Sequence, residues 1–443
     1  MLAAPSASAA YRGFVLALLV AAGVAGWMDR NVLAVLLESI KLDLGFSDTE
    51  LGLLGGAAFG VLYSIAGLPI AWVADRANRS ALLALALGLW SVMTALCGAA
   101  SSFSALFLAR VGVGLGEAGG SPPSQSLISD YFPPERRGFA LGVFYLHIPL
   151  GFVAGFLLGG WLDETVGWRL AFVIVGVPGV LLALVLRLTL REPPRGAADP
   201  FVPRAEAPAL SAALRDLASR RSLRHLPVAG AAYGIGAFAA AVWLPAYFVR
   251  VHGVGAAEAG AWMALAYGVG GGVGVLAGGW LADRTSRRTG DERWYAWGSA
   301  AAVAATVPCA CVLYLAESRA LAVSSLLAGT AAGHMFLGPV TAMVQGLAGV
   351  SRRAVAAAIY LLLVNLVSMG VGPVAVGIVS DALGPRFGHA ALRFALLGVV
   401  AASAVWAVVH FVLAARTLRE DLASARGLRP DAASCQPAAP CVR

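Results

Sequence analysis

Apolar runs long enough to cross a membrane recur along nearly the whole length of this chain. A helical crossing needs about 20 mainly apolar residues. Only 13% of the residues are charged, against about 25% in an average soluble domain. Because lipid offers the backbone no hydrogen-bond partners, runs of this length favour helices over barrel strands. The sequence therefore predicts an all-α membrane protein with twelve transmembrane helices, at 13–37, 50–73, 80–99, 104–128, 138–161, 167–188, 226–249, 259–282, 294–315, 320–346, 354–380 and 390–415.

The basic residues are distributed unevenly among the predicted loops. The chain has 32 Lys and Arg against 24 Asp and Glu, which gives a net charge of +8. Most of the basic residues fall in the N-terminal segment, in every second loop and in the C-terminal tail. By the positive-inside rule this places both termini in the cytoplasm of a protein integral to the inner cell membrane. Topology thus explains the positive charge, and we expect no nucleic-acid partner.

A polar, proline-containing stretch between the sixth and seventh spans divides the chain into two halves. We expect a six-helix bundle at 1–188, a cytoplasmic linker at 189–225, a second six-helix bundle at 226–415 and a disordered cytoplasmic tail at 416–443. The second part of the linker is either a short amphipathic helix on the membrane surface or a solvated connector. Its apolar residues with helical spacing are Leu210, Leu214 and Leu217.

Short motifs recur at matching places in the two halves. "AWVADRANRS" (71–80) follows the second span and "GWLADRTSRR" (279–288) follows the eighth, while "PPERRGFALG" precedes the fifth span and "VSRRAVAAAI" precedes the eleventh. The fifth and eleventh spans each combine Pro with spaced Gly and end in Asp. Two parallel repeats of six spans are typical of transporters that rock around a site at mid-membrane. The sequence thus predicts two pseudo-symmetric bundles with the site between them.

The repeated Asp-Arg loop resembles the hallmark loop of the major facilitator superfamily (MFS). Within that superfamily, "MDRNVLAVLL", "RVGVGLGEAGGSPPSQSLISDYFP" and "FYLHIPLGFVAG" resemble segments of the Spinster family. The resemblance implies the MFS fold and proton-coupled export of lysophospholipids or phosphorylated sphingoid bases. The residues that match the family's charged positions are Asp29, Arg30, Arg110 and Glu117.

Asp29 and Arg30 lie side by side in the first span. Each costs about 2.5–3.5 kcal/mol at a helix centre, and such residues usually face a cavity or a partner helix. Neighbours on a helix point about 100° apart, so each charge needs a partner elsewhere. In the fourth span, Arg110 and Glu117 share one face, about 10 Å apart along the axis, and we expect Arg30 to pair with Glu117.

Glycines in the fourth span suggest how that pair forms. Gly112 and Gly116 make a small-residue ridge that lets another helix approach closely, and we expect the first span to pack there. The pair is then either a fixed structural contact or a switch linked to protons. In the second case, protonation of Glu117 releases Arg30 to hold an anionic head group, and Asp29 is the other candidate proton site. The proton gradient supplies the energy, and we expect no cofactor.

The Asp-Arg loops are candidate conformational gates. We expect Asp75 and Asp283 to receive backbone N–H groups at the start of a neighbouring helix and the following arginines to hold acids across the interface between the halves. Solvated turns are the alternative. The gate arginines are Arg76, Arg79, Arg284 and Arg287.

Several other polar residues within the spans are candidates for lining the cavity, with hydrogen-bonded packing as the alternative for the histidines. The predicted surroundings are otherwise apolar, which suits a charged head group with an apolar tail. These candidates are Tyr63, Tyr145, His147, Tyr233, His334, Gln345, Tyr360 and Asn365.

Together these features favour a proton-coupled carrier of amphiphilic anionic or zwitterionic lipids. A carrier of small organic anions or drugs is the alternative, and a non-transporting membrane sensor is a third. The chain lacks an enzyme's nucleophile and base pattern, a nucleotide loop and the spacing of metal ligands. We therefore expect neither an enzyme nor a metal protein. Each chain holds both halves of its pathway, so we expect a monomer.

Overall fold

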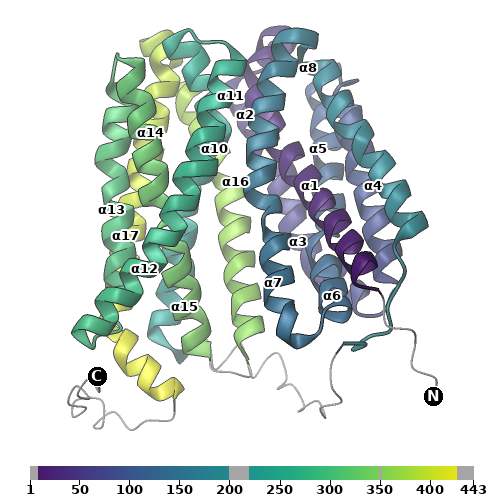
Figure 1. The fold of residues 1–443 in the computed structure, drawn as a ribbon. Helices are drawn as coiled ribbons and strands as arrows, with labels where there is room; N and C mark the ends of the chain where they lie inside the picture. The colour runs from purple at the N-terminus through teal and green to yellow at the C-terminus, as the bar shows by residue number, and fades with distance from the viewer. Residues whose placement is uncertain (1–7, 199–218, 349–351, 427–443) are drawn as a thin grey trace. The chain divides into compact units, whose positions relative to one another are not determined.

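Every regular element of the described residues is a helix (Figure 1). The computed structural model describes residues 8–198, 219–348 and 352–426. The predicted amphipathic segment with Leu210, Leu214 and Leu217 lies outside them. The helices of the first part of the chain are α1 (Ala9–Leu44), α2 (Asp48–Gly52), the π-helix η1 (Leu53–Ala57), α3 (Ala58–Ala74), α4 (Arg79–Cys97), α5 (Phe103–Glu117), α6 (Ser121–Tyr131), α7 (Pro134–Tyr145) and α8 (His147–Thr189).

The second part of the chain repeats this pattern. Its second span is again interrupted by a π-helix, η2. The helices are α10 (Arg221–His252), α11 (Ala256–Leu265), η2 (Ala266–Gly270), α12 (Gly271–Thr289), α13 (Trp294–Leu315), α14 (Arg319–His334), α15 (Leu337–Ala348), α16 (Arg353–Phe387), the 3₁₀ helix η4 (Gly388–Ala390) and α17 (Ala391–Ala425).

The helices account for the twelve predicted spans. Nine helical stretches of the described residues are long and apolar enough to cross a membrane. Two of them, Pro134–Thr189 and Val355–Ala425, have 56 and 71 residues, which is enough for two crossings each at about 20 residues per crossing. The remaining span, the fourth along the chain, consists of α5 and α6. The predicted all-α membrane fold is confirmed.

The fifth and sixth spans meet inside α8, at Gly167. This residue has φ 79° and ψ 162° within an otherwise helical stretch. Such a positive φ carries no Cβ penalty for glycine but is strained for other residues. The chain therefore turns between two spans here without a loop, at the boundary that the sequence predicts.

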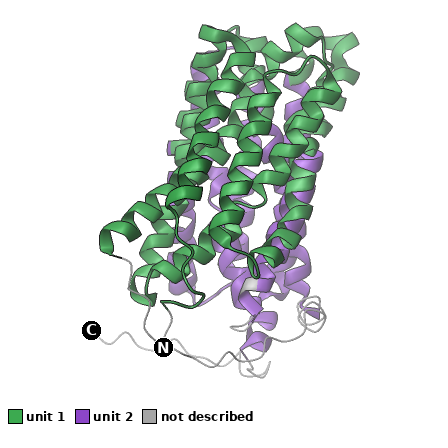
Figure 2. Ribbon diagram, turned by 90° about the vertical axis from the view of Figure 1, so that its right-hand side faces the viewer, with its two compact units in different colours: residues 1–203, 241–268, 373–392 green, residues 204–240, 269–372, 393–443 purple. Residues whose placement is uncertain are grey.

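Contacts divide the chain into two compact units (Figure 2). Unit 1 comprises residues 1–203, 241–268 and 373–392, and unit 2 comprises residues 204–240, 269–372 and 393–443. Unit 1 thus includes the ends of α10 and α16 together with α11, from the second half of the sequence. In unit 1 we call the end where α1 begins the near end, and the end where α1 stops at Leu44 the far end.

The last helix extends further than the sequence predicts. We expected the span to end at 415 and a disordered tail to follow, but α17 continues to Ala425. The reason is packing, because Leu418 and Leu422 are buried in the apolar core of unit 2 beside Leu347 and Phe411. The predicted tail therefore begins with helix.

Candidate functional site

Arg30 and Glu117 form the ion pair that the sequence predicts. The Nε atom of Arg30, in the middle of α1, donates a 2.6 Å hydrogen bond to Oε2 of Glu117 at the end of α5. The side chains are 16% and 3% exposed, so little water screens the pair. A charge-assisted bond in such surroundings is stronger than one between neutral groups.

Three aromatic rings surround the guanidinium group of Arg30. Its Cζ atom lies 4.9 Å from the ring centre of Trp27, 4.7 Å from that of Phe59 and 4.4 Å from that of Tyr63. Each cation–π contact is worth about 0.5–2 kcal/mol, depending on desolvation. Arg30 therefore keeps favourable contacts even where Glu117 is withdrawn. Tyr63, a predicted cavity residue, acts here as part of an aromatic cage.

Asp29 points to a different set of groups. It is 1% exposed, and its Oδ2 atom accepts a 3.0 Å hydrogen bond from the hydroxyl of Thr94 in α4. Its Oδ1 atom has no hydrogen-bond partner among the described residues. Neighbouring Arg110 is equally buried, and its Nε and Nη1 atoms also lack partners there. Since unpaired buried polar groups cost free energy, these two residues are candidates for a change of charge or partner.

The glycine ridge of the fourth span packs against a different helix from the one predicted. We expected α1 on Gly112 and Gly116, but a Cβ atom at these positions would meet Met93 and Trp90 of α4. Close approach of α1 depends instead on its own Gly26, where a Cβ atom would lie 3.4 Å from Oε2 of Glu117. The predicted pair is therefore correct, although the packing inferred for it is wrong.

A small pocket opens beside the ion pair. It leaves about 30 Å³ for the centre of a water molecule, enough for one or two waters. His147 contributes to its wall, and the Nδ1 atom of this residue lies 2.6 Å from the carbonyl oxygen of Phe144. Nothing in the sequence marks Trp27, Trp90 or Ser124 as lining residues, because aromatic residues and serines are common throughout membrane helices. The charged and aromatic lining residues are Trp27, Arg30, Trp90, Glu117, Phe144 and His147.

The other predicted cavity residues do not line this pocket. Tyr145 is half exposed, next to His147. In unit 2, Tyr233 packs edge-on against Phe336 at 4.9 Å, and Nδ1 of His334 lies 2.7 Å from the carbonyl oxygen of Thr330. The remaining three are also in unit 2, where Tyr360 and Asn365 are half-buried and Gln345 is exposed.

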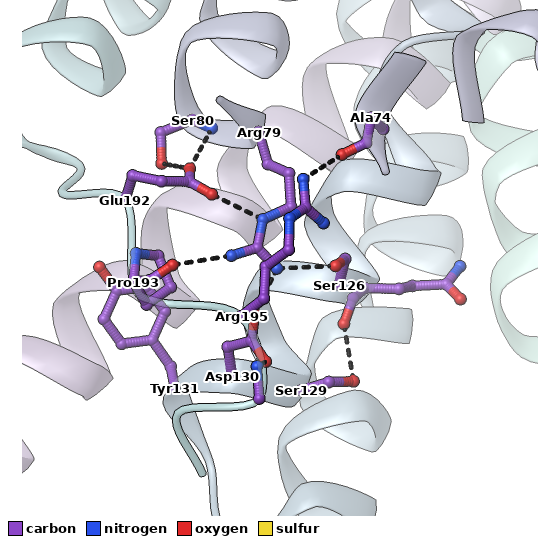
Figure 3. Close-up of polar contacts among 12 residues, drawn as sticks. Ala74, Arg79, Ser80, Ser126, Ser129, Asp130, Tyr131, Glu192, Pro193 and Arg195 are labelled. Atoms are coloured by element: carbon purple, nitrogen blue, oxygen red, sulfur yellow. Dashed lines mark hydrogen bonds and ion pairs between the residues drawn. The ribbon is translucent and has the colours of Figure 1, made fainter. Parts of the chain in front are cut away.

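Arg79, a predicted gate residue, is fully engaged within unit 1 (Figure 3). It is 1% exposed and pairs with Asp130 at the end of α6 and with Glu192 after α8, the latter at 2.7 Å. Its Nη1 also donates to Ser126, and its Nη2 donates to the carbonyl of Pro193. The sequence predicts an acid of the other half as its partner, whereas both acids here belong to its own half.

Glu192, which pairs with Arg79 at the near end, also binds the start of α4. Its Oε2 atom accepts hydrogen bonds from the amide and the hydroxyl of Ser80, both at 2.9 Å. Burial alone would raise the pKa of the Glu192 carboxyl, but the bonds from Ser80 and Arg79 outweigh it and hold this pKa below its ordinary value. Arg195 adds bonds to the carbonyls of Ala74 and Ala77, so residues 191–196 are tied to the loop between α3 and α4.

Each of the other predicted gate residues either is exposed or contacts a residue of its own unit. Asp75 is exposed and makes no side-chain hydrogen bond or ion pair to the described residues of unit 1. Asp283, its counterpart in unit 2, accepts a 2.7 Å hydrogen bond from the hydroxyl of Tyr295. Arg76 and Arg284 stack over Trp72 and Trp280, and Arg287 is exposed.

The far end of unit 1 carries a second charged cluster, which the sequence pattern does not predict. Arg250, near the end of α10, donates to Glu38 at 2.6 Å and to Asp48 at 2.8 Å. Asp48 also pairs with Lys41 and accepts a 2.6 Å bond from Ser380 of α16. The cluster joins α1, α2, α10 and α16, which are distant in sequence.

Two acids at the far end cap the first turns of neighbouring helices. Asp381 of α16 accepts from the backbone amides of Asp48 and Thr49 at 3.0 and 2.8 Å. Glu164 of α8 accepts from the backbone amide of Ala257 at 2.9 Å. Anions are stabilised at helix starts by free N–H groups and the helix dipole. The same arrangement thus occurs twice, on the second and the eighth span.

Comparison with known proteins identifies the family. A family model described as Major Facilitator Superfamily matches residues 18–373. The chain belongs to the major facilitator superfamily. This MFS protein is accordingly a membrane transporter and not an enzyme.

Individual relatives show which members of the superfamily this chain resembles. This MFS protein is 36% identical to an MFS-type efflux pump of Mycolicibacterium smegmatis, over 91% of its own length and 93% of the pump's. The crystal structure of a bacterial homologue of the human lysosomal transporter Spinster, inward-facing and unoccupied, matches it with a TM-score of 0.83 and 28% identity, covering 94% of this chain and 99% of that one. The sphingosine-1-phosphate transporter of Danio rerio is 31% identical over 52% of this chain and 48% of its own. The resemblance to Spinster proteins is therefore confirmed.

Proposed function

We propose that this MFS protein is a proton-coupled secondary transporter that works by alternating access. Its substrate is an amphiphilic lipid with an anionic or zwitterionic head group, such as a lysophospholipid or a sphingoid phosphate. The observation that carries this proposal is the buried Arg30–Glu117 pair at the wall of a pocket, with a second buried carboxylate, Asp29, next to it.

The charges around the pair support proton coupling. Glu117 is neutralised by Arg30, whereas Asp29 has a single hydroxyl partner and no ion pair among the described residues. An isolated buried carboxylate is costly in its charged form. We therefore assign the resident proton of this conformation to Asp29. When Glu117 takes up a proton in its turn, Arg30 loses its counter-ion and is free to bind an anion.

The substrate class follows from what Arg30 offers. Its planar fork matches a phosphate or carboxylate, and the aromatic cage keeps the guanidinium group in place while its partner changes. Apart from Arg30, the pocket residues that α1 and α4 contribute are small, apolar or aromatic, among them Ala22, Leu83 and Trp90, which suits an acyl or sphingoid chain. The resemblance to a sphingosine-1-phosphate transporter over half of the chain also supports a lipid substrate.

The proposal includes the orientation of the protein in the membrane. The excess of Arg in the near-end loops favours a cytoplasmic near end with both termini inside the cell. The cluster around Arg250 would then face the outside.

Flux in proteoliposomes tests the proposal. A labelled lysophospholipid is loaded, a pH gradient is imposed, and wild type is compared with Glu117→Gln and Arg30→Ala. We expect the gradient to drive flux in wild type and in neither variant. Glu317→Gln, which removes an exposed acid between α13 and α14, is the matched control and should transport normally. Flux that is indifferent to the gradient in wild type would disprove proton coupling.

A second candidate substrate class is small organic anions or drugs. The observation in its favour is the similarity to an efflux pump over nearly the whole chain. The same vesicles distinguish the two. If wild type carries drugs or organic anions but no lysophospholipid, the coupling scheme remains and the lipid substrate is rejected.

A further inference from the structure

Trp72 and Arg76 form an exposed stacked pair at the carboxyl end of α3. The Cζ atom of Arg76 lies 4.0 Å from the ring centre of Trp72, which is 60% exposed. Arg76 is exposed as well, and its Nη1 donates a 3.0 Å bond to the carbonyl of Trp72. The contact holds the guanidinium group over the ring, and its other N–H groups have no hydrogen-bond partner among the described residues.

An apolar stripe leads to this pair along α3. Ile65 and Leu68 are 53% and 56% exposed and, together with Trp72, follow the i, i+3, i+7 spacing of one helix face. Tyr63, which faces Arg30, is nine positions from Trp72, or two and a half turns. The stripe therefore lies on the side of α3 opposite the charged site.

The same arrangement occurs in unit 2, on α12. Val273, Leu276 and Trp280 repeat the spacing and are 57%, 77% and 58% exposed. Arg284 stacks over Trp280 at 5.1 Å, four positions later as in α3. The opposite face of α12 is packed, since Gly278 lies against the backbone of Met335. One helix of each unit thus carries an exposed Trp–Arg pair at the end of an apolar stripe.

We propose that these two pairs bind the phosphate groups of anionic phospholipids. Tryptophan prefers the level of the lipid head groups, and a guanidinium fork one turn beyond it is at the depth of the phosphates. Arg matches a phosphate with parallel N–H bonds. Neither Asp75 nor Asp283 forms an ion pair with the Arg that follows it among the described residues, and Asp283 accepts from Tyr295 instead. Both guanidinium groups therefore keep N–H groups for a phosphate. The sites are separate from the Arg30 pocket, and the inference does not depend on the substrate.

The test is a fluorescence quenching titration in phosphatidylcholine vesicles. Increasing fractions of brominated phosphatidylglycerol or brominated phosphatidylcholine are added, and the signal of Trp72 and Trp280 is obtained by difference from Trp72→Phe/Trp280→Phe. An Arg beside an anionic surface contributes enough for about fivefold tighter binding. We therefore expect phosphatidylglycerol to bind about fivefold better than phosphatidylcholine at these tryptophans.

Charge-removal variants identify the groups responsible. Arg76→Gln/Arg284→Gln should bring the ratio of the two binding constants close to one. The control, Arg288→Gln, removes one charge from the exposed last turn of α12, as each single variant Arg76→Gln or Arg284→Gln does, and should leave the ratio unchanged. Equal quenching by both lipids in wild type would overturn the proposal. So would an equal loss in the Arg288 control, which would mean a diffuse charge effect.

Single variants test the same proposal if Arg76→Gln/Arg284→Gln does not fold. Arg76→Gln and Arg284→Gln are then measured singly, and each should remove the preference at one of the two tryptophans. Retention of the full ratio in both single variants would also overturn the proposal.

Discussion

Arg250 donates a 2.6 Å hydrogen bond to Glu38, a residue 212 positions earlier in the chain. Arg250 also contacts Asp48, and its side chain is only 8% exposed. Removing one partner of a buried charge pair costs about 3–5 kcal/mol, and because Lys41 remains on Asp48 we expect the lower end for Arg250→Ala. At about 1.4 kcal/mol per tenfold, the far-end contacts should then open at least a hundredfold more often.

Cysteine labelling measures this opening. Ser124, a pocket residue, is replaced by Cys in a cysteine-free background, and an impermeant maleimide is added from the far side. Arg250→Ala should raise the labelling rate strongly, whereas Arg319→Ala, at the start of α14, should not. An unchanged rate would mean that the cluster does not hold the far end closed.

Asp29→Asn should separate coupling from transport. The amide is close in size to the carboxylate and its oxygen still accepts from Thr94, but it cannot carry an exchangeable charge. We expect gradient-driven flux to fall to the level of empty vesicles while exchange of substrate across the membrane continues.

The control for Asp29 is Asp163. This carboxylate is half-buried and also accepts a 2.6 Å bond from one hydroxyl, that of Ser39, but it lies at the far end of unit 1, close to the turn of α8 at Gly167. Asp163→Asn should retain gradient-driven flux. Equal loss in both variants would assign the effect to folding and not to the proton.

We expect Glu192 to make the thermal stability of the protein sensitive to acid. Its pKa is lowered in the folded protein, so its bonds contribute fully above the ordinary glutamate pKa of about 4.3. They are lost as the pH falls through the lowered value. In thermal unfolding between pH 7 and pH 3, Glu192→Gln should start with a lower Tm and lose less on acidification than wild type. Glu135→Gln, in the exposed first turn of α7, should behave as wild type. Parallel curves for wild type and Glu192→Gln would refute the assignment.

Gly23 should not tolerate a side chain. A Cβ atom there would lie 2.5 Å from Cγ of His147, whereas a Cβ atom at Gly13 of the same helix meets nothing within 4 Å. Overpacking of this kind costs about 1–3 kcal/mol. Gly23→Ala should lower the Tm of the purified protein, and Gly13→Ala should leave it unchanged or raise it slightly because alanine favours helix. A normal Tm for Gly23→Ala would show that His147 moves freely.

The fold could be predicted because the local composition of the chain is enough to identify a membrane span. Each span is a run of apolar residues, and lipid leaves the backbone no alternative to the helix. The end of α17 was missed because the burial of Leu418 and Leu422 depends on contacts that no local pattern reveals. The division into these two units could not be predicted from the sequence either. The ends of α10 and α16 pack on helices that are far away in the chain, and no local pattern indicates such contacts.

The candidate site was only partly predictable. Charges in an apolar run are conspicuous, so Asp29, Arg30, Arg110 and Glu117 were identified and one pair was correct. The aromatic cage was missed except for Tyr63, because Trp27 and Phe59 look like ordinary membrane residues. The cluster around Arg250 was missed for another reason. Its members lie at span ends, where charged residues are common, and only the fold brings them together.

The far-end caps have a consequence for how this protein tolerates sequence change. Glu164 holds the backbone amide of Ala257, not its side chain, so almost any residue at position 257 preserves the bond, and proline alone removes its donor. The acid has no such freedom, because the whole contact depends on its carboxylate. At this cap, therefore, the residue that donates can vary while the residue that accepts cannot. The Asp381 cap is more constrained, because the side chain of Asp48 also pairs with Arg250 and Lys41.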